Sequence, residues 1–211
     1  MTILTWLDYT GVAVFAATGA LVASRKQLDI IGFLFFACIT GIGGGTLRDL
    51  ILGLTPVFWV REHIYILICV AVAIVIFFTA QRLESRYRWL LWLDAAGLAV
   101  FSVMGAAIGL SATASPAIAI VTGVLTATFG GVLRDVLSGE PTVLMRREIY
   151  ITAALLGASV FVLADEFGLN RGLASMLAFA AALILRGGAL RYGWTLPSYG
   201  HAPGRPPDES L

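Results

Sequence analysis

The sequence GGTLRD at residues 44–49 is followed 86 positions later by GGVLRD at residues 130–135. The same spacing aligns many further identical residues from Leu7 to Glu62 of the first copy, and no gap is needed. A match of this length at one fixed displacement indicates an internal duplication rather than a motif that recurs by chance. Both strings place two glycines and an arginine–aspartate pair inside apolar sequence.

The composition is that of an integral membrane protein. Of the 211 residues, 59% are hydrophobic and only 13% are charged, and the mean hydropathy is +0.90. Soluble domains carry about 25% charged residues. The net charge of +1 leaves no basic face for phosphate neutralisation, which argues against a nucleic-acid partner. Cys38 and Cys69 both lie in apolar stretches, where inert buried thiols are expected.

The apolar stretches predict an all-α membrane protein with seven transmembrane helices. A helix needs about 20 residues to cross the hydrocarbon core. The seven candidate spans are 5–23, 29–47, 63–80, 89–109, 116–134, 148–164 and 172–190.

The basic residues of the loops predict the orientation of the chain. One side of the membrane receives nine of them: Arg25, Lys26, Arg82, Arg86, Arg88, Arg146, Arg147, Arg191 and Arg205. The other side receives Arg61 and Arg171 when the two motif arginines are set aside. The positive-inside rule therefore predicts a multi-pass membrane protein with the N-terminus outside and the C-terminus in the cytoplasm. Residues 193–211, which are rich in proline, are predicted to form a disordered cytoplasmic tail.

The two copies are predicted to be antiparallel, because each contains an odd number of spans. Residues 1–86 form the first three-helix repeat, 87–168 the second, inverted repeat, and 169–192 a seventh helix outside the duplication. A pseudo-two-fold axis in the membrane plane would bring corresponding positions together near mid-membrane. Inverted-repeat transporters build their ion and substrate sites there.

The motif glycines predict that the second and fifth spans are broken helices. They are Gly43, Gly44 and Gly45 in the first copy and Gly130 and Gly131 in the second. Each glycine costs a helix roughly 1 kcal/mol relative to alanine, and unwound backbone is tolerated in a membrane only where it is buried or lines a cavity. Close helix packing through small residues is the alternative.

The motif also places Arg48, Asp49, Arg134 and Asp135 inside predicted spans. A charged side chain at the centre of a bilayer costs roughly 2.5 to 3.5 kcal/mol even on insertion scales. Adjacent side chains leave a helix about 100° apart, so we expect each arginine to reach a neighbouring helix rather than its own aspartate.

Asp8 and Asp94, at equivalent starts of the first and fourth spans, are the natural partners of these arginines, or else N-terminal helix caps. Together with the hydroxyls of Thr40 and Thr126, the arginines would line a polar path between the copies. Alternatively, the ion pairs are structural latches at the membrane interface. An arginine in a pore repels cations and suits a gate better than a cation ligand.

Nothing in the sequence points to catalysis. There are two histidines, and no Ser/His/Asp or Cys/His constellation is present. We expect no enzyme activity, no metal site and no cofactor.

The doubled Gly-Gly-x-x-Arg-Asp motif, on the second span of each three-span repeat and with a seventh span following, resembles the prokaryotic trimeric intracellular cation channels. The resemblance extends from about Leu7 to Leu190. It implies a homotrimer in the inner membrane, with lipid around it and one pore per protomer bounded by spans one, two, four and five. It also implies passage of monovalent cations, chiefly potassium. Arg134 matches a basic residue linked to gating, and Arg48 is its counterpart.

The second copy departs from the first at Phe129, which stands where the first copy has Gly43. A phenylalanine there would stiffen the fifth span and could narrow the path. The same bacterial domain has been associated with uptake of glycine, so a secondary transporter for glycine or another small amino acid is the alternative function. A carboxylate could dock beside Arg48 or Arg134 at a positive half-helix end.

Overall fold

The computed structural model describes residues 3–83, 85–142 and 148–197. Across these residues the regular structure is helical, apart from one isolated bridge between Glu148 and Thr195. The helices are α1 (Ile3–Arg25), α2 (Ile30–Ile51), α3 (Phe58–Arg61), α4 (Ile64–Thr79), the short 3-10 helix η1 (Ala80–Arg82), α5 (Arg86–Thr113), α6 (Pro116–Ser138), α7 (Ile151–Glu166) and α8 (Arg171–Tyr192). Each predicted span corresponds to one long helix, and α3 was not predicted.

Local sequence sets where the helices begin and end. The Asp29 carboxylate accepts the N–H of Gly32 at 2.8 Å, and the Asn170 side chain accepts the N–H of Leu173 at the same distance. Pro116 opens α6, where its missing N–H costs nothing. Gly139 ends that helix with a φ of +67°, a left-handed conformation that glycine adopts without a steric penalty.

Six of these helices are long and apolar enough to cross a membrane: α1, α2, α4 extended by η1, α5, α6 and α8. The helical membrane class is therefore confirmed. The remaining predicted span, α7, has 16 residues and a length of about 24 Å. It is somewhat shorter than a hydrocarbon core of about 30 Å, so the seventh crossing stays a prediction.

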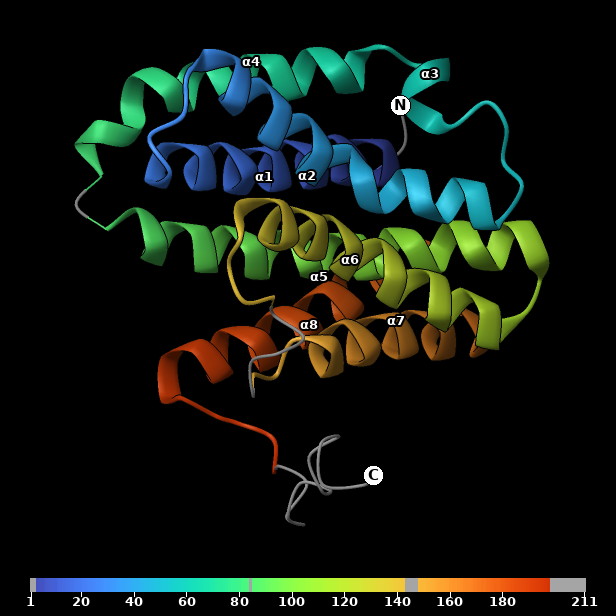
Figure 1. Cartoon of the computed structure of the whole chain (residues 1–211). Helices are drawn as coiled ribbons and strands as arrows, with labels where there is room; N and C mark the ends of the chain where they lie inside the picture. The colour runs from blue at the N-terminus through green and yellow to red at the C-terminus, as the bar shows by residue number, and fades with distance from the viewer. Residues whose placement is uncertain (1–2, 84, 143–147, 198–211) are drawn as a thin grey trace, which may run out of the picture.

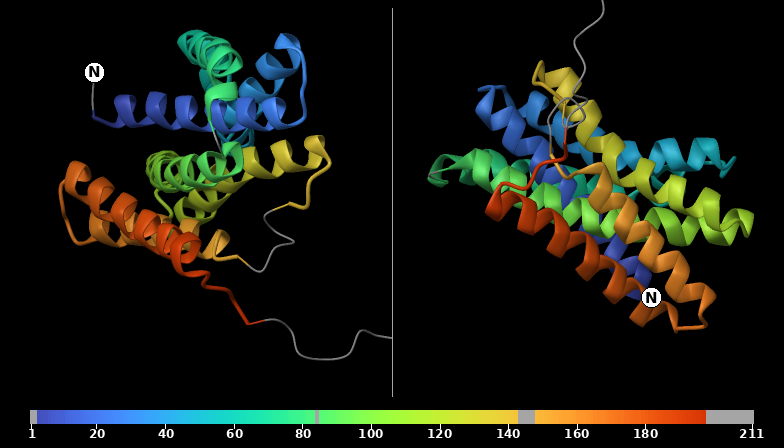
Figure 2. Two further views of the ribbon diagram at one scale, coloured as in Figure 1. Left: turned by 90° about the vertical axis from the view of Figure 1, so that its left-hand side faces the viewer. Right: turned by 90° about the horizontal axis from the view of Figure 1, so that it is seen from below.

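The long helices form two three-helix bundles with α8 added outside. Figure 1 shows α1, α2 and α4 in the upper part of the view, α5 and α6 in the middle, and α7 and α8 below. The bundles meet where α1 packs on α5 and α2 packs on α6, and α8 covers α5 and α7. Figure 2 shows the same arrangement from two further sides.

The packing of α1 on α5 reveals the pseudo-two-fold relation of the copies. Phe15 and Phe101, which are 86 positions apart, lie with ring centroids 5.1 Å apart. A Cβ at Gly97 would lie 3.2 Å from the Phe15 ring, and one at Gly11 would lie 2.7 Å from the Phe101 ring. Each phenylalanine thus packs over the glycine of the other copy, as an inverted duplication requires.

The motif glycines lie within continuous helices, so the predicted breaks in the second and fifth spans are not observed. Both α2 and α6 run through their glycines without interruption. A Cβ on Gly44 would collide with the carbonyl oxygen of Thr126, and one on Gly130 with that of Thr40. The glycines let the two helices cross at backbone contact, which is the close-packing alternative.

The predicted tail, residues 193–211, lies mostly outside the described residues, which end at position 197. Within the described part, Gly193 closes α8 with a φ of +70°.

Candidate pore site

The motif arginine of each copy binds the aspartate that follows it. Arg48 donates from Nε and Nη2 to Oδ1 of Asp49 at 2.9 and 2.7 Å. Arg134 makes the same two bonds to Asp135, both at 2.9 Å. The prediction that these neighbours cannot pair is therefore wrong. Their Cα–Cβ bonds diverge, but the arginine side chain is long enough to bring its guanidinium back over the adjacent position.

In the second copy, Arg134 is the centre of a buried polar cluster. Its Nη1 donates to Oδ1 of Asp94 at 2.7 Å and to the Thr18 hydroxyl at 3.0 Å. The Tyr150 hydroxyl lies beside these groups, because a Cβ on Gly131 would be 2.8 Å from it and 3.6 Å from both Arg134 and Asp94. We call Arg134, Asp94, Asp135, Thr18 and Tyr150 the Arg134 cluster. Its members are at most 4% exposed.

The Arg134 cluster joins the two repeats, since Thr18 belongs to α1 of the first copy and the other members belong to the second copy. Its bonds are charge-assisted and shielded from water, which makes each worth about 1.5–3 kcal/mol. The predicted pairing of Asp94 with an arginine is confirmed.

In the first copy the corresponding aspartate has a different partner. Asp8 accepts a hydrogen bond from the Tyr65 hydroxyl at 2.5 Å, and among the described residues no ion pair joins it to Arg48. Asp8 and Asp94 both lie inside their helices rather than at the first residues. The helix-cap alternative is therefore wrong for both, and the arginine-partner alternative is wrong for Asp8.

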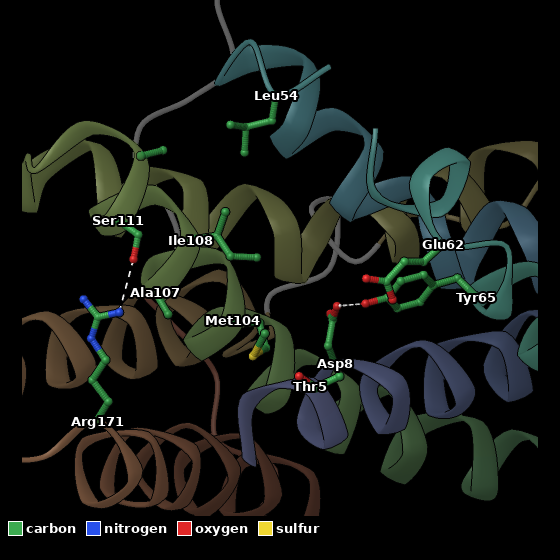
Figure 3. Close-up of a pocket in the computed structure, with 11 residues that line it drawn as sticks. Thr5, Asp8, Leu54, Glu62, Tyr65, Met104, Ala107, Ile108, Ser111 and Arg171 are labelled. Carbon is green, nitrogen blue, oxygen red and sulfur yellow. Dashed lines mark hydrogen bonds between the residues drawn. The ribbon is translucent and has the colours of Figure 1, made fainter. Parts of the chain in front are cut away.

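Two adjoining cavities lie beside Asp8. They measure 440 and 330 Å³ and share a wall of Asp8, Leu54, Glu62, Tyr65 and Ile108. Figure 3 shows the larger one, with Asp8 and Tyr65 joined on one side and Ser111 and Arg171 on the other. The smaller one reaches Arg48 and Asp49. We call both together the Asp8 chamber.

The chamber holds two carboxyl groups that form no ion pair within the described residues. Asp8 is bound by Tyr65, and Glu62 by the Tyr9 hydroxyl at 3.1 Å. Two of the three arginines that line the chamber are bound to other carboxylates: Arg48 to Asp49 at 2.7 Å, and Arg171 to Asp165 at 3.3 Å. The third, Arg61, lines the smaller cavity together with Asp8 and Glu62.

The two ends of the molecule therefore hold the same motif in two arrangements. At the end formed by the start of α1 and the end of α2, the motif borders a chamber. At the other end, Arg134 binds Asp94 and the groups are sealed from solvent. The repeats are alike in sequence and unlike in this contact.

The other predicted site residues lie away from the chamber. Thr40 and Thr126 are fully buried at the crossing of α2 and α6. The Thr126 hydroxyl donates to the Thr122 carbonyl at 2.6 Å, whereas the Thr40 hydroxyl has no partner within the described residues. Phe129 is half-buried on α6. Whether any of these residues lines a conducting path stays a prediction.

Sequence reasoning missed a third buried arginine, which joins Arg48 and Arg134. Arg186 of α8 is 1% exposed and donates to Glu148 at 2.6 Å. Its guanidinium also lies 5.1 Å from the centre of the Tyr150 ring, next to the Arg134 cluster. The signal was available, because a lone arginine in an apolar span is expected to face a partner.

The two tyrosines of the site were also missed. Tyr65 follows Glu62 by three residues, whereas Tyr150 follows Glu148 by two, so a fixed spacing of 86 does not align them. A single added residue, His63, hides the correspondence.

Comparison with known proteins agrees with the duplication. A protein-family model described as Glycine transporter matches twice, at residues 5–81 and 91–166, so the two matches also begin 86 positions apart. The UPF0126 inner membrane protein YadS of Escherichia coli is 37% identical over 196 residues, which cover 92% of this chain and 95% of that protein.

Solved structures match over nearly the whole chain. The trimeric intracellular cation channel orthologue from Rhodobacter sphaeroides is 56% identical, with a TM-score of 0.90 over 92% of this chain and 100% of that one. A prokaryotic channel of the same kind, solved in 0.5 M KCl, is 30% identical, with a TM-score of 0.86 over 92% of this chain and 98% of that one.

Proposed function

Because this chain belongs to the family of trimeric intracellular cation channels, we propose that it conducts monovalent cations, with potassium as the principal ion. The pore runs between the two inverted repeats of each protomer, and three protomers associate in the inner membrane. The relatives support the assembly and the location, since the matched structures are trimeric channels and YadS is an inner membrane protein.

The observation that carries this proposal is the unequal state of the two motif ends. The Asp8 chamber extends as far as Arg48 and Asp49, which line its smaller cavity. The Arg134 cluster closes the opposite end with a buried bond of 2.7 Å between Arg134 and Asp94. In this arrangement the Arg134–Asp94 bond blocks the proposed pore at one end, so the channel is closed. Arg134 is the proposed gate.

The charges of the site favour a cation over an anion. The motif arginines are paired with carboxylates, which cancels most of their repulsion toward a cation. Asp8 and Glu62 are bound by tyrosine hydroxyls, which carry no charge, and these two carboxyl groups outnumber Arg61, the one lining arginine without an ion pair among the described residues. The balance of loop charges predicts that the chamber lies on the outer face and the Arg134 cluster on the cytoplasmic side.

The test is a recording from purified protein in a planar bilayer under a potassium gradient. We expect unitary currents that reverse near the potassium equilibrium potential and carry many ions per opening. Saturable uptake of glycine into proteoliposomes without unitary currents would contradict the channel and support a transporter. The same preparation can be used for both measurements, so that loss of protein during purification affects both equally.

A further inference from the structure

A cavity at the other side of the molecule is unrelated to the proposed pore. It measures 360 Å³ and is lined by Arg88, Leu91, Trp92, Leu190 and Arg191. The first three belong to the start of α5 and the last two to the end of α8. Both helix ends lie on the left of Figure 1, and the two helices pack against each other. We call it the Arg88 cavity.

Two consecutive glycines of α8 shape the surroundings of this cavity. A Cβ on Gly187 would lie 3.1 Å from the Trp92 ring, and one on Gly188 would lie 2.7 Å from the Trp194 ring. The absence of side chains lets both indoles pack against the helix while Trp92 stays 42% exposed. The cavity thus has a tryptophan wall at the level where a helix leaves the membrane.

The two arginines of the cavity are free to bind an anion. Both are exposed, and within the described residues neither forms an ion pair with a carboxylate. Arg191 has only the neighbouring Tyr192 ring, 6.0 Å away. Among the described residues, no acidic side chain lines the cavity. Two guanidinium groups therefore lie beside an apolar wall with no counter-charge from the described part of the chain.

We propose that the Arg88 cavity binds the headgroup of an anionic phospholipid of the cytoplasmic leaflet. Basic pockets between transmembrane helices on this side of a membrane recognise such headgroups. The guanidinium groups would hold the phosphate through paired N–H donors. Leu91 and Leu190 would contact the glycerol and the first acyl carbons, and Trp92 would lie at the interface. Lipid binding at this site does not depend on ion conduction, so the two proposals can be tested separately.

Native mass spectrometry of the detergent-purified protein tests this proposal, with phosphatidylglycerol and phosphatidylcholine as the added lipids. We expect wild type to retain phosphatidylglycerol preferentially. In R88Q/R191Q the apparent affinity for phosphatidylglycerol should fall about twenty-five-fold, since each arginine near an anionic surface contributes about fivefold. The matched control K26Q/R82Q removes two positive charges from the same side, outside the cavity, and should bind as wild type does.

Three results would overturn the proposal. Equal losses in R88Q/R191Q and K26Q/R82Q would show a general attraction to the basic surface. Unchanged retention in R88Q/R191Q would place the lipid elsewhere. Inorganic phosphate that displaces phosphatidylglycerol at millimolar concentration would identify a phosphate site rather than a lipid site. If R88Q/R191Q does not fold, L190W keeps both arginines and fills the cavity, and it must also lose the preference for phosphatidylglycerol.

Discussion

Asp8 and Asp94 occupy equivalent positions in the two copies, but they accept hydrogen bonds from different partners. Asp94 accepts from Arg134 at 2.7 Å, while Asp8 accepts from Tyr65 at 2.5 Å. Both carboxyl groups are almost fully buried, so each needs a partner in the protein. Where the aspartate binds the motif arginine, as Asp94 does, the groups are buried together. Where it binds a tyrosine, as Asp8 does, a chamber lies beside the motif.

Replacing Asp94 with asparagine should open the closed end. D94N keeps the side-chain volume but removes one of the two carboxylates that hold Arg134, and leaves Asp135 as its remaining charged partner. A lost charge-assisted hydrogen bond is worth about 1.5–3 kcal/mol, which corresponds to at least a tenfold shift toward the open state. Single-channel recording should show a higher open probability with an unchanged unitary conductance. D29N is the matched control, because asparagine caps α2 as well as aspartate does. Equal open probabilities in D94N and wild type would make the pair a structural latch.

Asp8 should act on the current itself rather than on the gate. In D8N we expect a lower unitary conductance, because the chamber loses a carboxyl group that attracts the entering cation. The effect should be large in about 0.01 M KCl, where charges act over about 30 Å, and small in about 1 M KCl, where they act over about 3 Å. A conductance ratio between wild type and D8N that is independent of salt would show that Asp8 is not an electrostatic element of the path.

At the scale of the helices, α2 and α6 cross through their glycines. Gly44 lies over the Thr126 carbonyl and Gly130 over the Thr40 carbonyl, in a reciprocal contact of the two repeats. This crossing holds together the helices that carry the motif arginines. The glycines are therefore needed for packing, whether or not the helices also bend there when the channel opens.

A methyl group at either glycine should weaken this crossing. G44A and G130A place a Cβ against backbone that cannot rotate away, and overpacking of this kind typically costs about 1–3 kcal/mol. We expect a lower thermal midpoint in detergent for both variants, and by similar amounts because the contacts are symmetric. G172A, at the start of α8 and against a side chain that can move, should keep the wild-type midpoint. Stability equal to wild type in G44A would mean that the helices separate there at no cost.

The sequence predicted the helices far better than the contacts between their polar groups. Apolar length was sufficient for the helical membrane class and for the positions of the long helices, because both depend on composition along the chain. Neither apolar length nor the spacing of 86 could distinguish Asp8 from Asp94, since the duplication gives both the same neighbours. The choice of Tyr65 or Arg134 as partner depends on the relative position of helices in space. The pairing of Arg48 with Asp49 was likewise decided by side-chain length rather than by helical geometry.

At the scale of the whole molecule, two alike three-helix bundles pack against each other, and the Asp8 chamber borders the motif of only the first copy within the described residues. The chamber is lined by the start of α1, the segment after α2, the end of α5 and the start of α8. The Arg134 cluster draws on the other half of α1, with α5, α6 and the residue before α7. We therefore expect opening of the proposed pore to change the half of the molecule that holds the Arg134 cluster, while the chamber keeps its shape.

Single cysteines can test this division in intact cells. In a background without native thiols, C38A/C69A, we expect S111C in the chamber to react with a membrane-impermeant thiol reagent from the outside, because Ser111 lines the larger cavity. T18C belongs to the sealed cluster and is 0% exposed in wild type, so it should stay unmodified from either side. Adding D94N should make T18C reactive, since Arg134 then keeps only Asp135 as a charged partner and is held less firmly over it. Labelling of T18C without D94N would show that the cytoplasmic half is open at rest, and labelling of S111C only in inverted vesicles would reverse the orientation of the whole chain.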